Sequence, residues 1–251
     1  MEEIKYEEYY VAHLDILGFK DMIKKKNCEE IFSIFARMYL GSQTDVFSDS
    51  IIYETMKQVK HIIMSDSIVL YIEASLDDSF FSLLSICHRL QVSLADQEKP
   101  VLLRGGITKG KLFVMENIIY GEALVEAYTI EEKIAIYPRI IFSQKLLHDI
   151  ETNCKLVPKS TRQIYYFIDD DEFCTINYMS VQVYPKIRAG IDYIIHTFTY
   201  CQEIIDSCND ISVRNKYIWL KRKILLLIKL NENHWKNYPG WDELITTINK
   251  R

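Results

Sequence analysis

Alternating apolar and polar positions predict that strands and helices follow one another over the first 150 residues. Apolar runs rich in β-branched or aromatic residues predict strands at 8–18, 59–64, 67–73, 101–108, 111–115 and 139–142. Apolar residues at helical spacing predict helices at 27–39, 77–95 and 122–135. Lys109-Gly110 is read as a turn and residues 41–50 as a loop. This order is typical of an α+β sandwich with a mostly antiparallel sheet and its helices on one face.

The last hundred residues have a different pattern. Two short apolar runs, 164–168 and 172–176, predict a hairpin around Asp169-Asp170-Asp171. Amphipathic helices are then expected at 187–205, 213–230 and 242–248. We therefore divide the chain into an α+β domain at 1–150 and an extension at 151–251. The extension is a β-hairpin followed by helices, and it packs either on that domain or on a partner subunit.

Composition narrows the class of protein. The chain has 251 residues, 49% of them hydrophobic, and a formal net charge of −5. With no long basic block, we expect no nucleic-acid partner. The N-terminus lacks an apolar signal core and no apolar run is long enough to span a bilayer, so no membrane partner is expected. Six cysteines without a Cys-x-x-Cys pair are typical of a reducing cytoplasm, where we place the protein.

Two aspartates interrupt apolar, strand-like runs about fifty residues apart. Asp15 lies within Val11–Leu17, and Asp66 separates Ile62–Met64 from Ile68–Tyr71. A carboxylate in such a run is costly to bury unless its charge is compensated, and a divalent cation held by both aspartates would do so. Two alternatives remain open: Asp15 as a helix cap and Asp66 as a hairpin-turn residue.

Other candidate residues have plainer interpretations. His13 shares a strand face with Asp15, and we expect a structural rather than a metal-ligating histidine. Gly105-Gly106 is read as a β-bulge. Asp169-Asp170-Asp171 is read as a solvated turn in preference to a cation site. Arg104 is either a site residue or a surface strand residue in a salt bridge.

Four blocks, in order, carry a resemblance to a known family. They are Leu14-Asp15-Ile16-Leu17-Gly18-Phe19, Ser65-Asp66-Ser67, Leu103–Gly110 with Arg104 and three glycines, and Tyr120–Glu131 with Gly121, Ala127 and Glu131. Over about residues 8–135 the chain resembles the class III nucleotidyl cyclase catalytic domain of adenylate and guanylate cyclases. The resemblance implies the cyclase-like, ferredoxin-type sandwich as the fold of residues 1–150.

The same resemblance assigns roles to residues. Asp15 and Asp66 would bind two divalent cations, Mn²⁺ or Mg²⁺, with the Ile16 carbonyl as a further ligand. Backbone N–H groups of Leu17, Gly18 and Phe19 would bind the phosphates of a nucleoside triphosphate, and Arg104 would contact them too. Asp15, Asp66 and Arg104 are thus the expected catalytic residues, in a homodimer with its sites at the subunit interface.

Departures from the family pattern concern the base and the transition state. Ile62 and Ile118 occupy the two base-reading positions, and neither side chain can hydrogen-bond a purine edge. Val125 and Thr129 occupy the positions of the transition-state Asn and Arg. Nearby residues that could replace these are Tyr128, Lys133 and Arg139.

These departures resemble one branch of the family, the bacterial Pycsar pyrimidine cyclases. That branch implies a uridylate cyclase that makes cyclic UMP from UTP as a second messenger in antiphage defence, acting on a separate cyclic-nucleotide effector. The alternatives are a cyclic CMP or purine cyclase, or a degenerate domain that binds nucleotide without catalysis. The trigger, the effector and the selected base are not readable from the residues.

Overall fold

The structure is a computed structural model that describes residues 4–42, 53–153, 156–157, 162–180 and 191–250. The N-terminal part contains β1 (Glu7–Ile16), α1 (Phe19–Lys25), α2 (Cys28–Ser42), α3 (Tyr53–Met56), β2 (Lys60–Met64), β3 (Ser67–Glu73), α4 (Ser79–Ala95), β4 (Leu103–Met115), β5 (Ile118–Tyr120), α5 (Glu122–Lys133), β6 (Ile140–Phe142) and α6 (Gln144–Thr152). The remaining elements are α7 (Arg162–Tyr165), β7 (Tyr166–Ile168), β8 (Cys174–Ile176), α8 (Asp192–Ser207), α9 (Ile211–Trp235) and α10 (Trp241–Asn249).

One sheet organises the protein. Its strand order is β2-β3-β1-β4-β6-β8-β7, with β5 paired to β4. Every strand pair is antiparallel except β4 with β6. The first four strands, joined by helices between β1 and β2 and between β3 and β4, have the connectivity of a ferredoxin-type split βαβ unit. The predicted α+β sandwich with a mostly antiparallel sheet and C-terminal helices is confirmed.

Helices cover both faces of the sheet, so the expectation of helices on one face is wrong. Alternate residues of β1 point to opposite faces, because side chains in a strand have a period of two. Tyr10, Ala12 and Leu14 join the main core with α2 and α4, whereas Val11 packs in a second cluster against Ala123 and Ala127 of α5. Asp15 and His13 share the Val11 face and therefore lie on the α5 side.

The predicted turn at Lys109-Gly110 is also wrong. β4 runs through it without a break, and Lys109 and Gly110 pair with Tyr10 and Tyr9 of β1. Gly110 keeps ordinary strand pairing because the long β1 supplies a partner for it. Helix α6 was not predicted, although Ser143 caps it by accepting a hydrogen bond from the Leu146 N–H at 3.2 Å.

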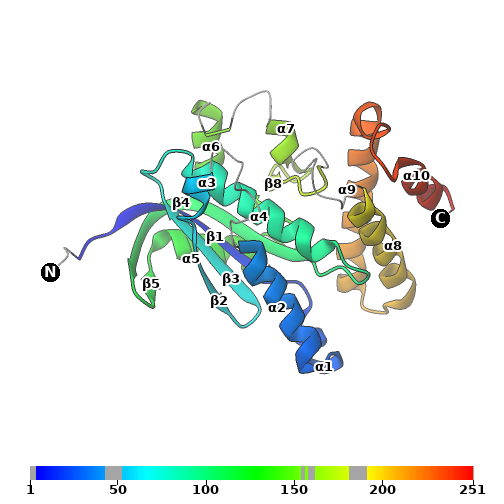
Figure 1. Cartoon of the computed structure of the whole chain (residues 1–251), viewed down its shortest axis with the longest axis horizontal. Helices are drawn as coiled ribbons and strands as arrows, with labels where there is room; N and C mark the ends of the chain where they lie inside the picture. The colour runs from blue at the N-terminus through cyan, green and yellow to red at the C-terminus, as the bar shows by residue number, and fades with distance from the viewer. Residues whose placement is uncertain (1–3, 43–52, 154–155, 158–161, 181–190, 251) are drawn as a thin grey trace.

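The predicted hairpin at 164–176 joins the main sheet through β8, which pairs with β6. Figure 1 shows α8, α9 and α10 gathered at the opposite end of the molecule from β5, with the two termini far apart. The predictions for residues 43–50 and 187–190 lie outside the described residues. The division of the chain at residue 150 stays a prediction.

Candidate functional site

The candidate site lies where β1 ends. Asp15 is paired with Ser67 of β3 on one side and with Arg104 of β4 on the other. Asp66 lies in the tight turn between β2 and β3, where Ser65 adopts a left-handed φ of 54°. The Ile16 N–H donates to the Asp66 carbonyl at 3.0 Å, which ties this turn to the end of β1.

The Asp15 and Asp66 side chains lie close enough for Asp66 to act on the titration of Asp15. Burial raises the pKa of Asp15 to about 6; Arg104 opposes this rise and the charge of Asp66 adds to it. The structure therefore brings together the two predicted metal-binding aspartates, fifty-one positions apart, on one side of the sheet.

Arg104 links Asp15 to a third carboxylate. Its Nε donates to Asp15 Oδ2 at 3.1 Å, and its Nη2 lies 2.7 Å from Glu131 Oε1. The Arg104 side chain keeps 24% of its surface exposed, so the two carboxylates do not enclose it completely. The salt-bridge interpretation is correct for the geometry, and it leaves room for a phosphate contact.

Glu131 is the site residue to which sequence reasoning gave no role. It lies on α5 with only 3% of its surface exposed, and burial raises its pKa to about 7. Its Oε2 is 3.8 Å from His13 Nδ1, and the His13 ring packs edge-on against Tyr128. The available signal was its spacing, four residues after buried Ala127 on the same helix face.

Gly106 allows α5 to lie this close to the sheet, and Gly105 allows β1 and β4 to lie close together. A Cβ on Gly106 would be 2.5 Å from the Ala127 carbonyl oxygen, and one on Gly105 would be 2.5 Å from the His13 carbonyl oxygen. The β1–β4 register is continuous through both positions, so the predicted bulge is wrong. Close approach of backbone and helix, rather than a change in register, explains the pair of glycines.

The turn after β1 contains the backbone N–H groups that are predicted to bind phosphate. Gly18 is exposed and left-handed, with φ 79°, and precedes α1. The Leu17 N–H already donates to the Leu102 carbonyl at 2.9 Å, so it is not free for a phosphate. Gly18 and Phe19 remain as candidate amide donors.

The residue types at this site fit hard divalent cations. Two neighbouring carboxylates, one of them with a raised pKa, form a pair whose mutual repulsion a cation would relieve, and oxygen is the donor that Mg²⁺ and Mn²⁺ prefer. The Ile16 carbonyl is the further predicted donor. No cluster of three or more His, Cys, Asp or Glu side chains suited to a metal occurs among the described residues, so any cation would draw on backbone, water or substrate oxygens.

Of the positions that depart from the family pattern, Ile118 and Val125 are exposed, whereas Ile62 and Thr129 are partly buried. Val125 is 64% exposed, and the Thr129 hydroxyl donates back to the Val125 carbonyl at 2.7 Å. Ile118, on β5, is also exposed. Arg139, one of the suggested replacements for the transition-state residues, is buried and bound to Asp169 and Asp171, so it cannot serve that role here.

In the part of the chain that the structure describes, no helix is both long enough and apolar enough to cross a lipid bilayer.

Comparisons with known proteins reach solved structures only. No family model and no curated protein matches the chain. Similar structures include the catalytic core of a rhodopsin-guanylyl cyclase with converted specificity in complex with ATPαS (15% identity, TM-score 0.47, covering 58% of this chain and 82% of that one). The adenylyl cyclase CyaB from P. aeruginosa is also similar (14% identity, TM-score 0.46, covering 60% of this chain and 83% of that one). A third is a bacterial light-regulated adenylyl cyclase (13% identity, TM-score 0.46, covering 71% and 95%).

Proposed function

We propose that this chain is a nucleotidyl cyclase that converts UTP to 3′,5′-cyclic UMP and pyrophosphate. The observation that carries the proposal is the close pair Asp15 and Asp66, beside an exposed left-handed glycine turn and a partly accessible Arg104. This arrangement places oxygen donors, amide donors and a guanidinium on one side of the sheet. That combination suits a triphosphate with its divalent cations.

In the proposed reaction, the ribose 3′-oxygen bonds to the α-phosphorus in line with the bond that breaks. Pyrophosphate leaves with the bridging oxygen, and the hydroxyl proton passes to water. Two divalent cations, when bound, would neutralise the triphosphate and lower the pKa of the 3′-hydroxyl. Asp15 and Asp66 orient the reacting end, Gly18 and Phe19 donate backbone N–H groups to the phosphates, and Arg104 balances their charge.

Ile62 and Ile118 cannot hydrogen-bond a purine edge, so purine selection of the family's usual kind is not kept, and the preference for UTP is proposed from the resemblance to the pyrimidine cyclases. By resemblance to the Pycsar cyclases, cyclic UMP would act on a separate effector in cytoplasmic antiphage defence. The enzyme would be a homodimer. Exposed apolar side chains of the β4–β5 hairpin and the α5 region offer a surface for the second subunit: Met115, Ile118, Tyr120, Val125, Tyr128 and Ile136.

The test is incubation with each of the four nucleoside triphosphates and Mn²⁺, with products identified by mass spectrometry. We expect cyclic UMP and pyrophosphate, and loss of both in Asp15→Ala and Asp66→Ala while circular dichroism stays unchanged. Asp77→Ala, an exposed aspartate after β3, is the matched control and keeps activity. Absence of a cyclic product from all four triphosphates would contradict the proposal.

A second candidate is a nucleotide-binding module without catalysis. It is favoured by Val125 and Thr129, since an exposed valine and a hydroxyl bound to its own helix cannot stabilise a transition state. This candidate predicts triphosphate binding that depends on Asp15 and Asp66, with no product formed. Equilibrium binding measured beside the product assay separates the two.

A further inference from the structure

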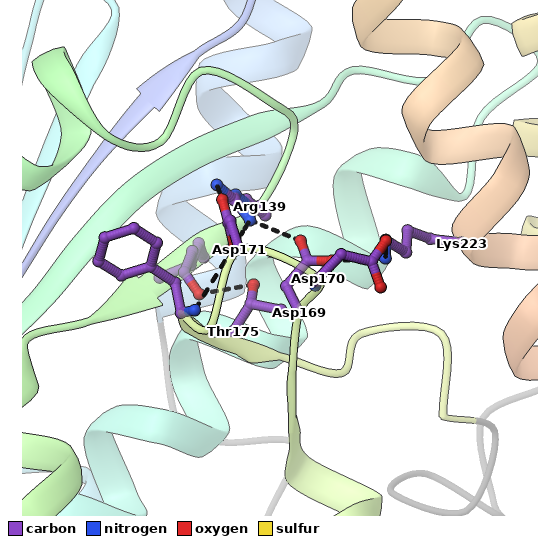
Figure 2. A network of polar contacts seen from close by, with 8 residues as sticks. Arg139, Asp169, Asp170, Asp171, Thr175 and Lys223 are labelled. Atoms are coloured by element: carbon purple, nitrogen blue, oxygen red, sulfur yellow. Dashed lines mark hydrogen bonds and ion pairs between the residues drawn. The ribbon is translucent and has the colours of Figure 1, made fainter.

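Helix α9 is joined to the sheet by a buried ion-pair network (Figure 2). Lys223 Nζ lies 2.5 Å from Asp169 Oδ1 and 2.6 Å from Asp170 Oδ2. On the other side of the turn, Arg139 pairs with Asp169 and Asp171, each at 2.5 Å. Asp169 is buried, so the interpretation as a solvated turn is wrong for this residue, whereas Asp170 and Asp171 lie in an exposed turn. Through these aspartates the turn between β7 and β8 joins Arg139, just before β6, to Lys223 of α9.

Aromatic packing fixes the same face of α9. The Trp219 ring stacks on Tyr137 with centroids 5.0 Å apart and planes 7° from parallel. The Arg139 guanidinium lies 5.6 Å from the Trp219 ring centroid. Trp219 and Lys223 are one helical turn apart, so the helix face that carries them is held against residues 137–139.

This contact lies next to the candidate site. The Arg139 carbonyl accepts a hydrogen bond from the Gly105 N–H at 3.0 Å, and Arg104 is the residue before Gly105. Lys216 lies three residues before Trp219, on the docked face and one turn nearer the start of α9. Lys223 contacts the turn between β7 and β8, and Trp219 contacts Tyr137 just before β6, so the next turn toward the start of α9 continues across the sheet toward β4 and Arg104.

The surroundings of Lys216 agree with this placement. It is half-buried, and no carboxylate of the described residues lies within ion-pair distance of its ammonium group. Burial lowers the pKa of Lys216, and the positive charge of Arg104 lowers it further, while Asp210 and Asp15 act in the opposite direction. Lys216 is thus close enough to Arg104 and Asp15 to feel their charges.

We propose that Lys216 is a substrate-binding residue, supplied to the site by the C-terminal extension, whose ammonium group contacts the phosphates of the triphosphate. The Lys223–Asp169 ion pair is the positioning contact that holds it there. Two neighbouring cations repel each other, and an anion bound between Lys216 and Arg104 would stabilise both. This inference rests on the proposed function, because it takes the triphosphate as the ligand.

The experiment measures binding of α,β-methylene-UTP with Mn²⁺ by calorimetry, since this analogue cannot release pyrophosphate. We expect Lys216→Met to raise Kd about tenfold or more, as for loss of a hydrogen bond to a charged group. Lys216→Arg should recover part of the affinity. Lys229→Met is the matched control, an exposed lysine of the same helix, and should leave Kd unchanged.

A second pair of variants tests the positioning role. Lys223→Met should raise Kd in the same direction, Lys223→Arg should restore it, and the double variant with Lys216→Met should bind no worse than Lys216→Met alone. Thermal unfolding of each variant shows whether the fold is kept. If wild type binds the analogue and Lys216→Met binds equally well, this inference is overturned while the proposed function stands. If wild type does not bind it, both are overturned.

Discussion

At the residue scale, the carboxylates around Arg104 have different roles although all lie at one site. Asp15 and Asp66 lie close together, whereas Glu131 is buried behind the guanidinium. Glu131 therefore contacts Arg104 from the buried side, and on the proposed function we expect it to act on substrate only by fixing the orientation of Arg104. A displaced guanidinium would weaken the phosphate contact without changing the fold of the domain.

Glu131→Gln should lower kcat/KM for the triphosphate about tenfold to a hundredfold, since the neutral amide no longer holds the Arg104 guanidinium in place. Glu132→Gln is the matched control, because its side chain is exposed on the same helix. Steady-state kinetics with thermal unfolding of both variants provides the measurement. Equal activity of Glu131→Gln and wild type would remove Glu131 from the site.

His88 gives a prediction about stability rather than activity. It is fully buried on α4, its Nε2 lies 3.1 Å from the Asn177 carbonyl, and burial lowers its pKa to about 4. The unfolded chain binds this proton near pH 6.5, so stability present above pH 6.5 is lost as the pH falls toward 4. The loss attributable to His88 is about 3 kcal/mol.

Urea unfolding at pH 7 and pH 4.5 measures this loss. Wild type should lose more free energy of unfolding between the two pH values than His88→Gln, whose side chain does not titrate. His148→Gln is the control, because that histidine is not buried. The same acid sensitivity in His88→Gln and wild type would place its origin elsewhere.

At the element scale, the packing of α5 on the sheet depends on Gly106 of β4. Gly106→Val should destabilise the protein by about 1–3 kcal/mol, because its side chain would overlap the Ala127 carbonyl and Ile130. Gly110→Ala should cost less, since its Cβ would meet only the flexible Glu122 side chain and Ala123 at 3.3 Å or more. Denaturant midpoints of the two variants compare these costs. A Gly106→Val midpoint equal to that of Gly110→Ala would show that α5 can shift away.

Elements whose signals are local could be predicted from the sequence. The helix α2 begins with reciprocal hydrogen bonds between Asn27 and Glu30, both at 2.9 Å, and the predicted cap at Asn27 had this local cause. The strand predicted at 8–18 and the candidate aspartates Asp15 and Asp66 are likewise recognisable from the sequence, because each lies in a short apolar run. The continuous β4 was missed because a Lys-Gly pair favours a turn unless a neighbouring strand pairs with it.

The rest of the site depends on contacts between distant residues. Glu131 reaches Arg104 only because α5 crosses the sheet over Gly106. The acidic turn at 169–171 looks solvated in the sequence because its partners Arg139 and Lys223 lie about thirty and fifty residues away. The packing of the whole sheet, and not local propensity, decides which carboxylate forms an ion pair and with which arginine or lysine.

At the scale of the whole molecule, the surface on which the C-terminal helices dock is separate from the exposed apolar surface of β5 and α5. The C-terminal helices dock beside β6 and β8 of their own chain, through residues that do not overlap the exposed apolar surface of β5 and α5. One chain can therefore keep its extension docked and still present that apolar surface to a second copy. Large exposed apolar patches on soluble proteins mark such contacts.

We therefore predict a homodimer formed through β5 and α5. Ile118→Asp combined with Val125→Glu should shift the protein to a monomer, because two charges would be buried at the contact without partners. Light scattering after size exclusion measures the mass. Leu230→Asp, at an exposed apolar position on α9, is the control and should leave the dimer intact. If the double variant has the mass of wild type, the dimer forms elsewhere. If the double variant is monomeric and inactive while Leu230→Asp is dimeric and active, the second subunit completes the site.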